Sequence, residues 1–128
     1  MKTILSFFDL AVLFTLFSSC NKASTHQVKV KYINMTGSTL NGLGIGGKWI
    51  GKLENSQETK FLRYKEYNFD SGLPDEPISG KINGEKINDM SETYWCGTQK
   101  YTVEEGTFEI EIHKQSSDSK TWLMLVKR

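Results

Sequence analysis

The ten residues from Ile78 to Ile87 constrain the fold of this chain more than any other segment. Asn83-Gly84 stands near their centre, and this pair favours a type I′ turn because both central residues of that turn need positive φ. Such a turn predicts a hairpin with three facing pairs: Ile82 with Glu85, Lys81 with Lys86, and Gly80 with Ile87. The isoleucines of the segment then share one face, so the turn and the apolar pattern specify the same register.

The remainder of the chain after residue 27 also shows period-two alternation and frequent turn signals. We expect further strands within residues 28–33, 40–53, 59–64, 66–69, 94–96, 101–103, 108–113 and 122–126. Residues 40–53 should form two strands with a bend at Gly46-Gly47. Residues 122–126 are apolar on both faces, which suits a central strand covered on both sides or a strand whose outer face meets a partner. Both prolines fall in residues 70–77, which predicts a loop there. Residues 104–106 are expected to be a hairpin turn, and residues 115–119 a polar turn.

This pattern predicts an all-β fold in a single domain over residues 28–128. No helix-length amphipathic pattern follows residue 20, and the aromatic content of 12% is typical of a folded globular protein. About eight to ten short strands at this spacing favour an antiparallel two-sheet β-sandwich, immunoglobulin-like in outline. A small closed β-barrel is the alternative.

The N-terminal segment has the composition of a secretory signal peptide. Lys2 gives a basic start, residues 4–17 are largely apolar, and Ser18-Ser19 precede Cys20. The stretch is too short for a good membrane span, and Asp9 within it makes spanning costly. We therefore expect residues 1–19 to be a signal peptide.

Residues 17–20, Phe-Ser-Ser-Cys, resemble the lipobox of bacterial lipoproteins. The resemblance covers only the first twenty residues, and Phe17 stands where the family more often has leucine. It implies that the Cys20 sulfur becomes a diacylglycerol thioether and that the signal is then cut before Cys20. It also implies that the absence of aspartate at position 21 favours the outer membrane. A plain secretory signal cut near Ser19 or Ala23 is the alternative.

The lipoprotein resemblance also determines how the second cysteine is interpreted. Residues 20–27 would be a lipidated cysteine and a short polar tether. With its sulfur acylated, Cys20 cannot form a disulfide, so Cys96 becomes a lone thiol that survives best when buried. A thiol enzyme using Cys96 with His113 as base is an alternative hypothesis, but the sequence shows no orienting group or oxyanion pocket for it.

Metal, cofactor and nucleic-acid sites are not indicated. The formal net charge is +1, which does not suggest a basic nucleic-acid-binding face. Two histidines and one free cysteine do not supply the usual zinc spacing. Asp70, Asp75 and Glu76 could hold a calcium ion, but the favoured interpretation is a solvated acidic loop.

Exposed aromatic residues are the best candidates for a ligand contact. A flat exposed ring can stack on a sugar or on a peptide side chain, although most tryptophans of β-sandwiches belong to the core. The candidates are Trp49, Tyr94 and Trp95, with Trp122 as a fourth aromatic of interest. The leading hypothesis is a non-enzymatic envelope lipoprotein that binds a protein, peptide or glycan without a cofactor. A small envelope enzyme and a structural subunit of a surface assembly are the alternatives.

Overall fold

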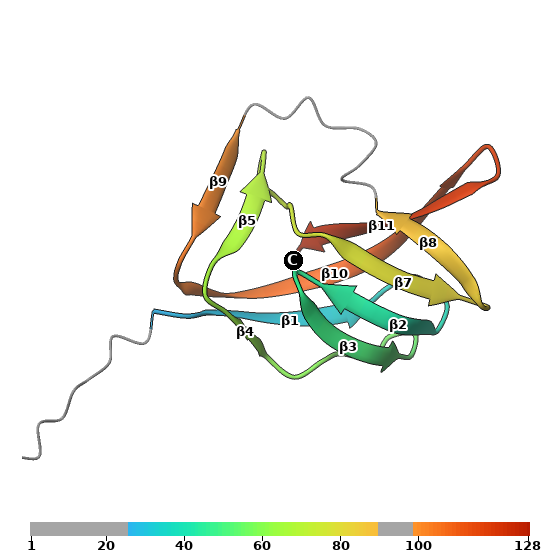
Figure 1. The fold of residues 1–128 in the computed structure, drawn as a ribbon, viewed down its shortest axis with the longest axis horizontal. Coiled ribbons are helices and arrows are strands. Elements are labelled where there is room, and N and C mark those ends of the chain that lie inside the picture. Colours follow the sequence, from blue (N-terminus) through green and yellow to red (C-terminus); the bar gives the residue numbers. More distant parts are fainter. Residues whose placement is uncertain (1–25, 90–98) are drawn as a thin grey trace, which may run out of the picture.

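A computed structural model describes residues 26–89 and 99–128, and every regular element in these ranges is a β-strand (Figure 1). The strands are β1 (Val28–Asn34), β2 (Leu40–Ile45), β3 (Lys48–Leu53), β4 (Leu62–Tyr64), β5 (Tyr67–Asp70), β6 (Leu73–Pro74), β7 (Ile78–Ile82), β8 (Glu85–Asp89), β9 (Lys100–Val103), β10 (Gly106–Ser117) and β11 (Lys120–Lys127). The all-β prediction is confirmed.

The strands form an eight-stranded sheet in the order β3-β2-β7-β8-β11-β10-β1-β4 and a three-stranded sheet in the order β6-β5-β9. The two halves of the larger sheet meet where β8 pairs with β11, at Trp122 opposite Asn88 and Leu123 opposite Asp89. Buried residues of both halves and of β5 belong to one hydrophobic core. This arrangement is consistent with a β-sandwich, and the sheets do not close into a barrel.

The hairpin predicted around Asn83-Gly84 is confirmed in every pair. Gly80 faces Ile87, Lys81 faces Lys86, and Ile82 faces Glu85. Asn83 and Gly84 have φ values of 52° and 79°, as a type I′ turn requires. The three isoleucines of this hairpin are buried in the core. The bend between β2 and β3 is confirmed in the same way, with positive φ at Gly46 and Gly47. The central position of β11, between β8 and β10, is also as predicted.

The sequence predicted an antiparallel sandwich, but two of the strand pairs that the structure describes are parallel. β1 pairs with β10 in parallel over seven residues, from Val28 opposite Gly106 to Asn34 opposite Ile112, and β8 pairs with β11 in parallel. Parallel neighbours need a long connection, because the chain must return to the same end of the sheet. Most of the domain separates β1 from β10 in sequence, and this intervening chain supplies the return.

The predicted hairpin turn at residues 104–106 is wrong. β9 pairs with β5 in the small sheet, whereas β10 pairs with β1 and β11 in the large one. This connection therefore passes from one sheet to the other. Turn-forming residues indicate where the chain reverses, but they do not specify which strand the next segment pairs with.

The predicted loop over residues 70–77 contains a short strand. Ser71 and Gly72 form a tight turn with φ values of 50° and 83°, and β6 then pairs with β5. Pro74 is tolerated because β6 is an edge strand, where a missing N–H breaks no ladder on the outer side. The polar turn expected at residues 115–119 is shorter than predicted, with Asp118 and Ser119 at its centre.

Three buried tyrosines join the two sheets through a chain of hydrogen bonds. The Tyr64 hydroxyl donates to the carbonyl oxygen of Ile45 at 3.0 Å. With that proton committed, the Tyr32 hydroxyl must donate to Tyr64 at 2.9 Å, and the Tyr67 hydroxyl to Tyr32 at 3.0 Å. Burial raises the pKa of Tyr64 to about 12 and raises the pKa of Tyr32 and Tyr67 as well. The hydroxyls therefore stay neutral, and we interpret this cluster as structural.

Candidate binding surface

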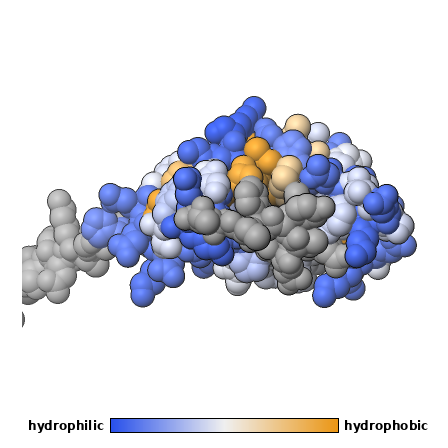
Figure 2. Space-filling model, turned by 90° about the horizontal axis from the view of Figure 1, so that it is seen from above, coloured by the Kyte–Doolittle hydropathy of each residue, from blue (hydrophilic) through white to orange (hydrophobic). Residues whose placement is uncertain are grey.

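Trp49 is the most exposed large hydrophobic residue in the described parts of the chain, with 76% of its surface accessible. It lies near the start of β3, which is one edge of the eight-stranded sheet. An indole left this open contributes little to the core. Of the candidate contact residues that the structure describes, Trp49 is therefore the one whose position suits binding. Figure 2 shows one face of the molecule, where hydrophilic surface predominates among the coloured residues and hydrophobic colour appears in small areas.

The Trp49 ring rests against two glycines of the same sheet. A Cβ atom at Gly42 would lie 3.7 Å from Cη2 of Trp49, and one at Gly51 would lie 3.5 Å from Nε1. Both glycines have positive φ, 58° and 86°, and the β2–β3 register shifts beside them. Glycine is favoured at such positions because a side chain would be strained there. The sequence thus supplies a bare backbone surface beneath an exposed indole.

Small and polar residues continue this surface across β2 and β7. Gly44 pairs with Trp49 on one side and with Ser79 on the other. In the next row Asn41 pairs with Lys81, and both are exposed, as is Ser79. We call Trp49, Gly44, Ser79, Asn41 and Lys81 the Trp49 strip. It offers one apolar ring beside hydroxyl, amide and ammonium groups, and all of these can bond to a polar ligand.

Several residues singled out from the sequence lie outside the described residues. These are Cys20, Tyr94, Trp95 and Cys96. Of the others, Trp122 is half-buried in β11, and His113 is half-buried in β10 with its Nε2 atom 2.8 Å from a carboxylate oxygen of Glu111. The hypothesis of a Cys96–His113 pair stays a prediction.

The solvated acidic loop predicted around Asp70, Asp75 and Glu76 is wrong for two of its members. Asp70 is 3% exposed and Glu76 is 8% exposed, because β6 folds this segment back onto β5. Asp75 instead lies 3.5 Å from the ammonium of Lys100. Within residues 26–89 and 99–128, no three histidine, cysteine or acidic side chains are grouped as metal ligands.

Glu76 is held as a buried acceptor beside the tyrosine cluster. Its Oε1 accepts hydrogen bonds from the backbone N–H of Asn68 at 2.7 Å and from its side-chain amide at 3.0 Å. Burial raises the pKa of Glu76, and these two bonds oppose that effect only in part. A Cβ atom at Gly46 would lie 3.0 Å from Oε2 of Glu76, so the bend between β2 and β3 packs closely against this carboxyl group.

Stability should depend on pH through Glu76. Because folding raises its pKa, the folded chain binds more protons than the unfolded chain between the ordinary and the raised value. The free energy of unfolding therefore falls as pH rises through that window. Glu76→Gln keeps an oxygen acceptor for Asn68 and should flatten this fall in urea titrations between pH 4 and 8. The exposed Glu85→Gln is the matched control, and an equally steep fall in Glu76→Gln would contradict the assignment.

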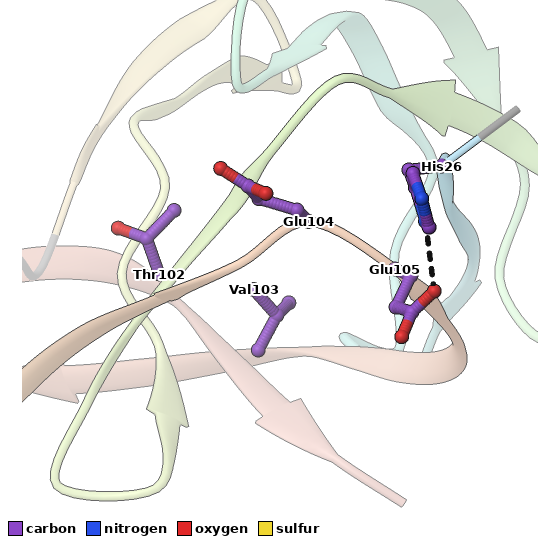
Figure 3. A pocket seen from close by; sticks show the side chains of 5 residues that line it. All are labelled: His26, Thr102, Val103, Glu104 and Glu105. Carbon is purple, nitrogen blue, oxygen red and sulfur yellow. Dashed lines mark hydrogen bonds and ion pairs between the residues drawn. The ribbon is translucent and has the colours of Figure 1, made fainter. Parts of the chain in front are cut away.

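An open pocket of about 480 Å³ lies beside the start of β1 (Figure 3). It is lined by His26, Thr102, Val103, Glu104 and Glu105. Nδ1 of His26 lies 3.0 Å from Oε2 of Glu105, and both side chains are exposed. An ion pair this exposed contributes little to stability. We call this hollow the acidic pocket.

The sequence matches no protein-family model, and no related protein is found among curated proteins. In the parts of the chain that the structure describes, no helix is long and apolar enough to cross a bilayer.

Proposed function

We propose that this protein is an exported lipoprotein, anchored through an acylated Cys20, whose β-domain is a non-enzymatic module that binds glycan through the Trp49 strip. The observation that carries the binding proposal is the 76% exposed Trp49 indole, which rests on glycine backbone and has polar residues beside it. The anchoring proposal rests on the lipobox-like residues that end at Cys20.

A sugar ring matches the chemistry of the strip. One face of a pyranose presents C–H groups that can stack on an indole, and its rim presents hydroxyls that need donors and acceptors. Trp49 supplies the apolar surface, while Ser79, Asn41 and Lys81 supply polar groups on the same side of the sheet. Because the Trp49 ring itself covers Gly42, the sugar would stack on the solvent-facing side of the indole.

The alternative of peptide capture by strand addition is less well supported. β3 is an edge strand, which a peptide can extend through backbone hydrogen bonds. However, the positive φ of Gly51 and the register shifts between β2 and β3 make this edge irregular. Exposed Lys48 and Lys52 also lie on it, and lysines at an edge discourage strand pairing. The ring face of Trp49 is therefore the favoured contact, not the strand edge.

Removing the indole should abolish most of the binding. With soluble cello-, chito- and malto-oligosaccharides as probes, Trp49→Ala should weaken the affinity at least about ten-fold, as expected for a central aromatic contact, and Trp49→Phe should weaken it less. Calorimetric titration measures the affinity. Met35→Ala is the matched control, because Met35 is also an exposed apolar side chain (46%) but follows β1 and is not part of the strip. Binding by none of the probes, or equal affinity in Trp49→Ala, would refute glycan recognition by this surface.

A further inference from the structure

A second open pocket, of about 310 Å³, shares His26 with the acidic pocket. It is lined by His26, Gln27, Lys48, Arg63, Tyr64 and Lys65. These residues come from the start of β1, the start of β3 and the end of β4, so the fold brings three separate segments of the chain together here. We call this hollow the basic pocket.

The cations of the basic pocket are not neutralised within the described domain. Lys48, Arg63 and Lys65 have no ion-pair partner among residues 26–89 and 99–128, although Lys48 lies 5.7 Å from the Tyr64 ring. Lys31 in the neighbouring strand β1 is different, since its ammonium lies 3.0 Å from Glu109. The pocket therefore gathers three cations that have no carboxylate partner within the described residues, whereas Lys31 is paired with Glu109.

A like-charge pair adds to this concentration of positive charge. Lys29 in β1 lies directly opposite Arg63 in β4, and like charges in facing positions of an antiparallel pair destabilise it. The facing pair of Lys29 and Arg63 therefore does not stabilise the domain. An anion outside the domain would remove the repulsion.

The basic pocket lies where the tether leaves the domain. Six peptide units separate Cys20 from His26, and they span at most ~22 Å when fully extended. If Cys20 carries the lipid, as proposed above, His26 and the pocket around it must stay within that distance of the anchor. Electrostatic attraction to a charged surface acts within roughly 8 Å at physiological salt, so a small bend in the tether brings the cations into range.

We propose that the basic pocket rests on anionic phospholipid headgroups and orients the domain on the bilayer, with the acidic pocket turned away from it. Glu104 and Glu105 of the acidic pocket are repelled by the same surface that attracts Lys48, Arg63 and Lys65. Each cation near an anionic bilayer strengthens attraction about five-fold. The attraction of three such cations is too weak to bind a free protein firmly to the bilayer. It is enough to favour one orientation of a protein that is already tethered there.

Lysine footprinting on the intact lipidated protein tests this orientation. The protein is reconstituted into vesicles of pure phosphatidylcholine or with 30% phosphatidylglycerol, then pulsed with an amine acetylating reagent and digested for mass spectrometry. Acetylation of Lys48 and Lys65 should be at least three-fold slower in the anionic vesicles. It should return to the neutral-vesicle rate in 1 M salt. Lys81 and Lys86, in the β7–β8 hairpin, serve as internal controls and should react equally in both.

The outcomes separate this inference from the anchor on which it rests. Protein that floats with both vesicle types but shows equal acetylation of Lys48 and Lys65 overturns the orientation and leaves the anchor in place. Protein that floats with neither refutes the anchor and the orientation together. A variant set gives a second test. In the parent protein, Lys29 should also be acetylated more slowly in anionic vesicles than in neutral ones. In Lys48→Gln/Arg63→Gln/Lys65→Gln, Lys29 should be acetylated at the same rate in both. The control set Lys86→Gln/Lys114→Gln/Lys120→Gln should keep the slower acetylation of Lys29 in anionic vesicles.

Discussion

Asn34→Ala should lower the free energy of unfolding by about 3 to 5 kcal/mol, because several buried polar groups would each lose a partner at about 1–3 kcal/mol. Asn34 ends β1 and is completely buried. Its amide nitrogen donates to the carbonyl oxygens of Ser38 and Leu53 at 2.8 and 2.9 Å. Its side-chain oxygen accepts from the backbone N–H and the hydroxyl of Thr36 at 3.0 and 2.7 Å.

These bonds combine local contacts with one that joins segments far apart in the chain. Those to Thr36 and Ser38 shape the turn between β1 and β2, and the bond to Leu53 ties that turn to the end of β3. The backbone of Asn34 adds two more bonds, because its N–H donates to Gln57 and its carbonyl oxygen accepts from Ser56. Alanine keeps the backbone bonds but not those of the side chain. The loss should therefore loosen one whole end of the sandwich.

Urea and thermal unfolding measure this effect, and a fall in Tm of roughly 10–20 °C is expected for a domain of this size. Asn41→Ala is the matched control, since Asn41 is exposed on β2 and should change stability by less than about 0.5 kcal/mol. Equal stability of the two variants would show that Asn34 does not hold this end of the sandwich.

Cys20→Ser should lower the amount of the protein in the outer-membrane fraction at least about ten-fold, if Cys20 carries the lipid as proposed. In the lipoproteins that the N-terminus resembles, the thioether forms before the signal is cut. A serine hydroxyl would therefore leave residues 1–19 attached as well as leaving the chain without lipid. Several acyl chains are needed for firm anchoring, since each buried CH₂ contributes only about 0.8 kcal/mol.

Density-gradient fractionation with immunoblotting measures both consequences, the lost outer-membrane signal and the larger precursor. Cys96→Ser is the natural control, because it alters the other cysteine of the chain and should leave processing and location unchanged. A Cys20→Ser chain that is cut and fractionated like the parent would mean that a plain secretory signal, not a lipobox, directs export.

The strands that the sequence predicted best are those whose turn and apolar pattern agree. Asn83-Gly84 fixes the β7–β8 register because the turn geometry and the buried isoleucines allow only one pairing. Pairings between distant strands could not be predicted in this way. The parallel match of Val28 with Gly106 depends on the packing of the whole sandwich, and nothing local to either strand encodes it. The same holds for residues 104–106, where the chain changes sheets.

The binding surface was predicted in part. Trp49 was identified as an aromatic that could contact a ligand, but its exposure depends on its place on an edge strand. The basic pocket was not foreseen, because Lys48 lies more than a dozen residues from Arg63 and Lys65 in sequence. The burial of Glu76 was also missed, since composition alone makes its segment look like a solvated loop. Each of these features arises from contacts between segments distant in sequence.

The intact mass of the protein extracted from membranes tests the central claim most directly. We expect a chain that begins at Cys20 and carries the added mass of a diacylglycerol thioether. An unmodified chain that begins after Ser19, or the uncut precursor from Met1, would contradict it.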